Sequence, residues 1–238
     1  MKAFCISLFL VMGINVFGSD WKTISVEQFQ SEMKIISDKV EDTHSYSVEI
    51  GYTTLESSAG EVIHDQSTGY IKYSDKNYHS YAMGIQSIQN TRERVVVDST
   101  NRIIAITNPV SEAIKNLSPE LSTLLLKKAS AIRKRIGNGM AEYQVDFGDQ
   151  LIISSYLLKV DENNLMKQLD IRYAQKLKNS SGAEANLQLR MVFNNWKLNP
   201  ALPESEFRAD RYVKSENGIY VPTPQYEGYE LSDERIKN

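Results

Sequence analysis

The chain has 238 residues, 41% of them hydrophobic, and its 30 Asp and Glu residues outnumber its 27 Lys and Arg residues. The formal net charge of −3 excludes the basic composition typical of nucleic-acid-binding proteins, so we predict no nucleic acid partner. After residue 20 the sequence has no apolar run long enough to span a bilayer, and we expect one large or two small folded domains.

Residues 1–18 have the features of a cleaved secretory signal peptide. A short positive start is followed by an apolar segment at 3–17 that is too short to span a bilayer stably, and cleavage is expected after Gly18 or Ser19. The one cysteine, Cys5, lies inside this segment, so the mature chain is expected to have no disulfide and no thiol chemistry. These features predict an exported chain, and the lack of disulfides is compatible with a bacterial periplasm.

The mature chain is predicted to begin with an amphipathic helix over residues 26–41. Ser25 and Gln28 have the spacing of a capping box, and apolar residues recur after them at helical spacing. Two interpretations predict the same apolar stripe. The helix is either a lid on a cavity or an element packed on a sheet.

Residues 44–108 read as a run of short antiparallel strands. Residues 44–55 alternate between apolar and polar, and further strands are predicted at 68–74, 78–88, 92–98 and 101–107, separated by short turns. The continuous apolar runs at 95–97 and 103–104 indicate that both faces of the sheet are covered there, by core or by ligand.

Residues 111–137 are predicted to be helical, with one helix over 118–136. Pro119 is placed at a helix start, and a Gly-Asn-Gly sequence follows at 137–139. The second half of this helix is basic. Most such runs are solvated faces, and docking to a membrane or a protein partner is the alternative. The candidate docking residues are Lys127, Lys128, Arg133, Lys134 and Arg135.

The segment at 141–198 alternates again and is predicted to form four strands of a second meander. One short strand is expected near 207–213. Residues 214–238 are predicted to be an extended tail rich in Tyr and Pro that lies on the domain or stays mobile, and its tyrosines favour docking.

The sequence has few signs of catalytic or metal chemistry. Its three histidines, His44, His64 and His79, lie in or beside different predicted strands and form no zinc motif. Asp146 and Asp149 flank a Gly as paired carboxylates that could do acid–base work, but nothing else in the sequence supports that role. We therefore predict no enzyme, no cofactor and no metal site, and an exported hydrolase ranks last among the hypotheses.

An exported chain with the order helix, meander, helical insertion and second meander resembles the LolA/LolB-like superfamily, the periplasmic lipoprotein-carrier fold. The Gly-led strand at 69–75, the strand that ends in Asp98 and the strand that leads to Pro109 carry the resemblance. Residues 195–207 resemble the closing strands. The resemblance covers about residues 24–213, whereas the tail at 214–238 has no counterpart.

The resemblance implies a mainly β (α+β) fold, an incomplete antiparallel β-barrel over residues 19–213 with helices covering its concave face. The expected function is a periplasmic carrier of an acyl chain, a lipid or a lipoprotein, gated by the helices at 26–41 and 118–136. The alternative is an interaction or sensor module of the cell envelope with a protein partner and no lipid cargo. The expected cavity lining, chosen by alternation and by the presence of Met, is Tyr52, Tyr73, Met83, Ile85, Val95, Val97, Leu189 and Met191.

Overall fold

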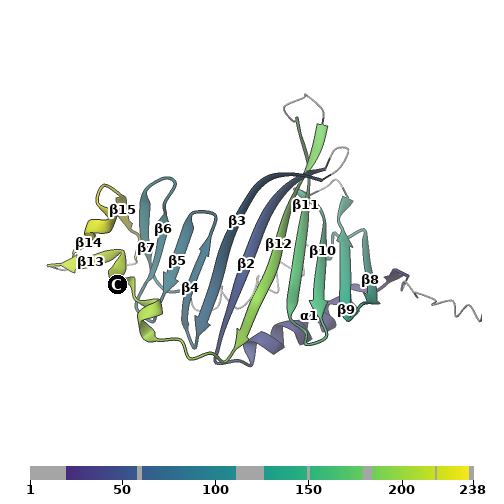
Figure 1. Ribbon diagram of the computed structural model, residues 1–238, viewed down its shortest axis with the longest axis horizontal. Helices are drawn as coiled ribbons and strands as arrows, with labels where there is room; N and C mark the ends of the chain where they lie inside the picture. The colour runs from purple at the N-terminus through teal and green to yellow at the C-terminus, as the bar shows by residue number, and fades with distance from the viewer. Residues whose placement is uncertain are drawn as a thin grey trace, which may run out of the picture.

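A computed structural model describes residues 20–57, 61–110, 126–148, 151–178, 184–217 and 219–235. Its main feature is one sheet of 13 strands in the order β1-β8-β9-β10-β11-β12-β2-β3-β4-β5-β6-β7-β15 (Figure 1). These strands are β1 (Lys22–Thr23), β2 (Ser45–Ser57), β3 (Glu61–Ser74), β4 (Asn77–Ala82), β5 (Ile85–Gln89), β6 (Arg94–Asp98), β7 (Ile103–Thr107), β8 (Ala131–Gly137), β9 (Met140–Asp146), β10 (Ile153–Asp161), β11 (Met166–Lys178), β12 (Glu184–Leu198) and β15 (Glu230–Asp233).

The strands β2 to β7 form the first antiparallel meander, as predicted. Two boundaries are wrong: β3 begins at Glu61 where the strand was expected to begin at 68, and a turn divides another expected strand. The single strand expected at 78–88 is the hairpin β4–β5, whose connection holds Met83 at φ 49° and Gly84 at φ 83°. A two-residue turn with both φ values positive suits the twist of a hairpin, so the chain reverses where continuous alternation predicted one strand.

The strands β8 to β12 form a second antiparallel meander, and β12 pairs with β2 to join the two meanders into one sheet. The four strands predicted over 141–198 are confirmed.

The helix predicted over 118–136 is wrong in its second half, because Ala131–Gly137 is the strand β8. Ile132 is buried, Lys134 and Ile136 follow it at period 2, and Asn138 and Gly139 both have positive φ in the turn to β9. An Asn-Gly pair is a strong hairpin signal, which the helical interpretation took as a helix end. Residues 118–125 lie outside the described residues.

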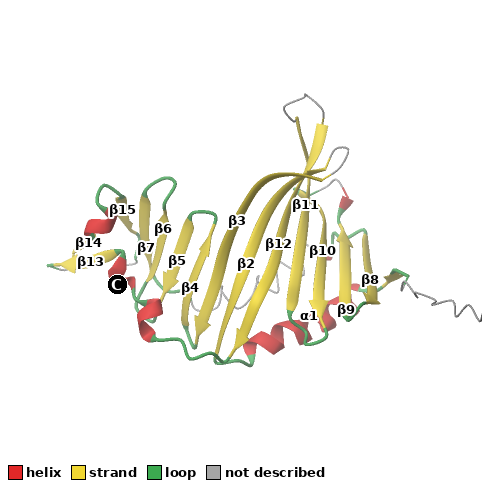
Figure 2. Ribbon diagram, viewed as in Figure 1, coloured by secondary structure: helices red, strands yellow, loops and turns green. Residues whose placement is uncertain are grey.

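The sheet is open, with β1 at one edge and β15 at the other (Figure 2). The expected incomplete antiparallel barrel is therefore confirmed, because the sheet is curved and its two edges do not pair. β15 runs parallel to β7, whereas every other pairing among the described strands is antiparallel.

The helix α1 (Val26–Glu41) is confirmed at the predicted residues. The Ser25 hydroxyl accepts a hydrogen bond from the backbone N–H of Gln28 at 3.1 Å, which caps the first turn. Phe29 and Ile36 are buried in a cluster with side chains of β8, β9 and β10. We call the face of the sheet against which α1 packs the helix face, and the other the opposite face.

The C-terminal segment packs on the opposite face at the other end of the sheet. It contains two short 3₁₀ helices, η2 (Glu204–Phe207) and η3 (Ala209–Arg211), the hairpin of β13 (Val213–Glu216) and β14 (Ile219–Pro222), a third 3₁₀ helix, η4 (Pro224–Tyr226), and β15. The strand expected near 207–213 is wrong, since this stretch is mostly 3₁₀ helix. The expected boundary between 213 and 214 falls inside β13.

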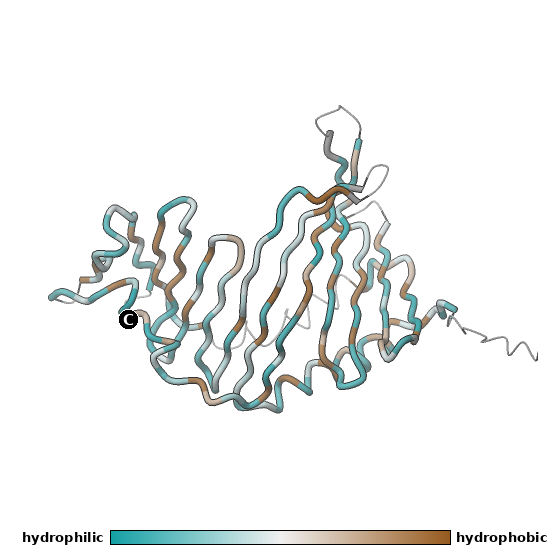
Figure 3. The backbone as a smooth tube through the Cα atoms, viewed as in Figure 1, coloured by the Kyte–Doolittle hydropathy of each residue, from teal (hydrophilic) through white to brown (hydrophobic). Residues whose placement is uncertain are grey.

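Tyrosines anchor this segment, as the sequence predicted. Tyr212 is fully buried in a cluster with apolar residues of β5, β6 and β7. Further tyrosines pack around that cluster, namely Tyr220, Tyr226 and Tyr229. The two ends of the sheet thus bury opposite faces, in keeping with the alternation of apolar and polar residues along the strands (Figure 3).

Candidate functional site

An apolar patch lies on the helix face at the centre of the sheet. Val48, Ile50 and Phe193 are its buried members, and half-buried apolar side chains pack around them. The patch comes from β2, β3, β11 and β12, and its half-buried members are Tyr52, Ile71, Met166, Leu169, Met191 and Trp196. Half-buried apolar side chains in this number make a surface that an apolar ligand could cover.

Aromatic rings border the patch. Tyr46 stacks on Tyr73 with 5.3 Å between ring centroids, and Trp196 stacks on Phe193 at 6.4 Å. The Trp196 indole N–H donates to the backbone carbonyl of Met166 at 2.9 Å, so its polar atom is satisfied within the sheet. Burial raises the pKa of Tyr46 to about 12, which keeps this ring neutral over the physiological range.

The structure brings together only some of the eight predicted lining residues. Tyr52 and Met191 face each other across β2 and β12, and Leu189 lies two residues from Met191 on the same face. Tyr73 is on this face as well, but it is buried beside Tyr46. These four residues are at or next to the apolar patch.

The other four predicted residues lie elsewhere. Met83 and Ile85 are 47% and 48% exposed, at and just after the β4–β5 turn. Val95 and Val97 are each 1% exposed and pack beneath the C-terminal segment on the opposite face. The apolar run predicted cover on both faces, but only the face of the two valines is buried in protein core, since Val96 on the other face is half-buried and Ile103 is 38% exposed.

The five predicted docking cations do not share one helical face. Arg133, Lys134 and Arg135 are consecutive in β8, so Lys134 faces away from the two arginines. Their ion pairs join Arg133 to Asp146 at 2.7 Å, Lys134 to Glu32 at 2.6 Å and Arg135 to Glu142 at 2.6 Å. Lys127 and Lys128 are exposed in the turn after Leu126.

A buried polar cluster that sequence patterns did not predict lies between β3, β4 and η2. His79 is 1% exposed, and its Nε2 lies 2.8 Å from the Tyr70 hydroxyl. The Lys72 ammonium donates to Glu206 at 2.8 Å, and Glu206 also lies 3.6 Å from Nδ1 of His79. Burial, followed by the charge of Arg211, lowers the pKa of His79 to about 4. The cluster ties the C-terminal segment to the sheet.

Within the described ranges, no group of three or more His, Cys, Asp or Glu side chains is arranged to hold a metal ion. The other two histidines lie near separate carboxylates, His44 near Asp75 and His64 near Glu56. Asp149 lies outside the described residues. No helix in the described part of the chain is both long and apolar enough to cross a membrane.

Several solved structures are similar to this chain. A DUF1329 family protein from Desulfovibrio piger is 9% identical, the match covering 77% of this chain and 97% of that one with a TM-score of 0.35. A LolA superfamily protein from Nitrosomonas europaea is 11% identical, with 76% and 97% covered and a TM-score of 0.33. An outer membrane lipoprotein-sorting protein domain from Vibrio parahaemolyticus is 6% identical, with 78% and 98% covered and a TM-score of 0.32.

A LolA superfamily protein is thus among the solved structures to which this chain is similar. No family model and no curated protein matches the sequence. At these identities, no residue of this chain takes its role from those proteins.

Proposed function

We propose that this protein is a periplasmic binding or carrier protein that holds an acyl chain, free or as part of a lipid or lipoprotein, on the apolar patch. The observation that supports this proposal is the group of half-buried apolar side chains supplied by four neighbouring strands. Met166 and Met191 are among them, and unbranched methionines adapt to ligands of irregular shape.

The size of the hydrophobic gain is sufficient for reversible binding. Each methylene removed from water contributes about 0.8 kcal/mol, so burying about eight methylenes gives about 6 kcal/mol before the entropic cost of association. After an association cost of about 4 kcal/mol or more, eight methylenes give weak and reversible binding, and each further methylene buried on the patch tightens it.

The test is native mass spectrometry of the mature protein purified without detergent, followed by titration with a fluorescent fatty acid. We expect a bound lipid or acylated peptide in the wild type and its loss in Met191→Glu, because a carboxylate on the patch would have to be desolvated by the ligand. Thermal unfolding of the variant checks that it is folded.

Val192→Glu is the matched control. Val192 is the next residue of β12 and points to the opposite face, so this variant has the same added charge away from the patch. Binding should survive in Val192→Glu. Two results would contradict the carrier function and favour an interaction module instead. One is an equal loss of ligand binding in both variants, and the other is a wild type that has no bound mass and takes up no fatty acid.

Export to the periplasm is part of the same proposal, supported by the sequence of residues 1–18. We expect N-terminal sequencing of the protein from the periplasmic fraction to begin at Ser19 or Asp20. Recovery of the protein from the cytoplasmic fraction with Met1 as its first residue would contradict export.

A further inference from the structure

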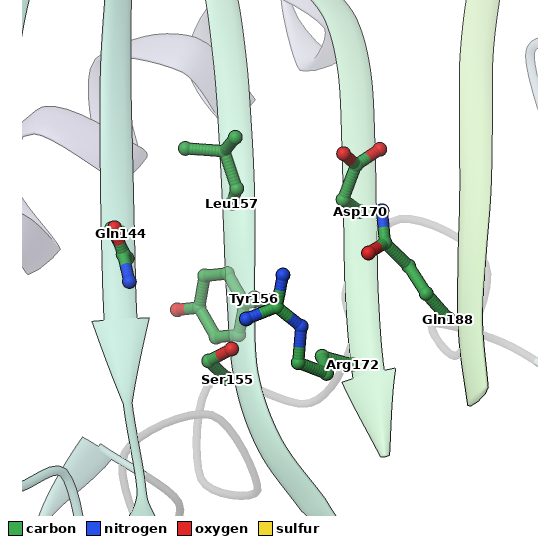
Figure 4. A pocket seen from close by; sticks show the side chains of 7 residues that line it. All are labelled: Gln144, Ser155, Tyr156, Leu157, Asp170, Arg172 and Gln188. Atoms are coloured by element: carbon green, nitrogen blue, oxygen red, sulfur yellow. The ribbon is translucent and has the colours of Figure 1, made fainter. Parts of the chain in front are cut away.

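A small polar pocket lies on the opposite face of β9 to β12 (Figure 4). Its volume is about 90 Å³, and the register places Ser155, Arg172 and Gln188 side by side on three adjacent strands. Gln188 precedes Leu189 in β12, so the pocket and the apolar patch are on different sides of the sheet. The lining residues are Gln144, Ser155, Tyr156, Leu157, Asp170, Arg172 and Gln188.

Hydrogen-bond donors without partners line this pocket. Gln188 is 5% exposed, Ser155 is half-buried and Arg172 is exposed, and none of these three side chains has a hydrogen-bond partner among the described residues. Figure 4 shows Arg172 extending from β11 toward β10 and Gln188 extending from β12 toward β11. No atom of these three side chains is among the fully buried unpaired atoms, so water reaches the donors. Three donors that face one small pocket point to a ligand that accepts hydrogen bonds.

Among the described residues, the two carboxylates nearest to the pocket, Asp170 and Asp146, are already neutralised. Asp170 accepts hydrogen bonds from Nε and Nη2 of Arg190 at 3.0 and 3.1 Å. Asp146, which faces Ser155 across the strands, forms an ion pair with Arg133 at 2.7 Å. In the described part of the chain, Arg172 is therefore the charge at the pocket without an ion-pair partner, and the pocket favours an anion over a cation.

We propose that this pocket binds a phosphate-type oxyanion, either inorganic phosphate or the end of a phosphomonoester. The guanidinium fork of Arg172 fits two oxygens of such an ion, and the amide of Gln188 and the hydroxyl of Ser155 can donate to others. A planar carboxylate would use the fork and leave the remaining donors unpaired. The volume equals that of about three water molecules, which admits one small ion.

The experiment is calorimetric titration of the mature protein with inorganic phosphate at low ionic strength. We expect one site per chain, binding at least about tenfold weaker in Arg172→Gln and in Gln188→Leu, and competition by sulfate. Arg92→Gln is the matched control. Arg92 is an exposed arginine in the β5–β6 connection, distant in strand order from the pocket, and its loss changes the net charge equally.

Three outcomes would overturn the proposal: no heat of binding up to about 10 mM phosphate, equal binding by Arg172→Gln and the wild type, or acetate binding more tightly than phosphate. This site does not depend on the acyl-carrier function. We expect phosphate binding to persist in Met191→Glu, so failure of one proposal is distinguishable from failure of the other. A second titration uses glucose 6-phosphate. Binding indicates a site for phosphomonoesters, and no binding indicates a site that accepts only the free ion.

Discussion

Gly69 lies opposite Ile50 in the register of β2 and β3, at the centre of the sheet. The packing around it requires a residue without a side chain. A Cβ atom at this position would overlap the backbone carbonyl of Tyr81 and lie 2.9 Å from the Tyr52 ring. The neighbouring strand and the tyrosine both occupy space that only glycine leaves empty.

We predict that Gly69→Ala lowers the free energy of unfolding by about 2 kcal/mol or more, because a backbone carbonyl cannot move aside as a flexible side chain can. Chemical denaturation measures the change. Gly51→Ala is the control, since the atom nearest to its added Cβ is the Val192 carbonyl oxygen at 4.0 Å. Equal destabilisation by the two variants would show that loss of glycine, and not the overlap, is responsible.

His79 makes stability depend on pH. Its pKa is about 4 in the folded chain against an ordinary value of 6.5, so the folded state holds the ring neutral while the unfolded state takes up a proton. Its contribution is therefore complete above pH 6.5 and is lost as pH falls toward 4. The groups that face the ring are Tyr70, Lys72, Gln86, Glu206 and Arg211.

We predict that the wild type loses about 3 kcal/mol more stability than His79→Gln between these two pH values. Denaturation curves across this range measure the stability of each protein. Groups that both proteins share contribute equally, so their titration cancels in the difference between the two. His44→Gln should behave as the wild type, because the His44 side chain is 94% exposed. Parallel pH profiles for the wild type and His79→Gln would exclude this role.

At the scale of elements, sequence patterns predicted most of the fold. The cap at Ser25 and the alternation in β2, β9 and β11 are local signals, and each led to the correct element. β8 was missed because Ile132 and Ile136 are compatible with both a helical stripe and a strand face, and the basic residues between them suggested a helix end. The Asn-Gly pair at 138–139 was the signal that could have decided it.

The candidate site was predicted less well, because its residues must be assigned to faces across several strands. Merging β4 and β5 hid the turn at Met83 and Gly84, and alternation could not be followed across the turn. Val95 and Val97 were consequently grouped with Met191, although they lie on the other face. The cover of these valines comes from residues more than 100 positions away, which no local pattern can show.

The strand β15 shows how a terminal element protects a sheet edge. The backbone N–H groups of Glu230 and Glu234 donate to Arg102 and Ile106 at 2.9 and 2.8 Å, while Leu231 packs on the cluster beneath. An unprotected edge strand is a template for pairing with other chains.

We predict that a chain ending at Gly228 has lower stability and faster amide hydrogen exchange in β7, together with a concentration-dependent tendency to associate. Exchange mass spectrometry and light scattering measure these effects. A chain ending at Arg235 is the control, because it keeps β15 and the contact of Arg235 with the Tyr220 ring at 4.4 Å. Unchanged exchange in β7 of the shorter chain would show that β15 does not protect this edge.

At the scale of the whole molecule, one sheet separates two clusters that lie on opposite faces and at opposite ends. The cluster under α1 draws its buried residues from α1 and β8 to β10, together with Leu126 and Phe147. The cluster under the C-terminal segment draws on β5 to β7, η3 and the start of β13. The central strands β2, β3 and β12 connect the two clusters. Such an arrangement favours two units of local stability over one uniform core.

We therefore predict that two matched substitutions loosen different ends of the sheet. Ile106→Ala, in β7, and Leu158→Ala, in β10, each remove a buried aliphatic side chain at 0% and 5% exposure and should each cost about 2–5 kcal/mol. Hydrogen exchange should rise in β4 to β7 for the first variant and in β8 to β11 for the second, with β2 and β12 least affected in both. If both variants raise exchange equally along the sheet, the chain unfolds as one cooperative unit. In that case a ligand on the central patch would stabilise both ends alike, whereas two separate units would confine its effect to the strands that it touches.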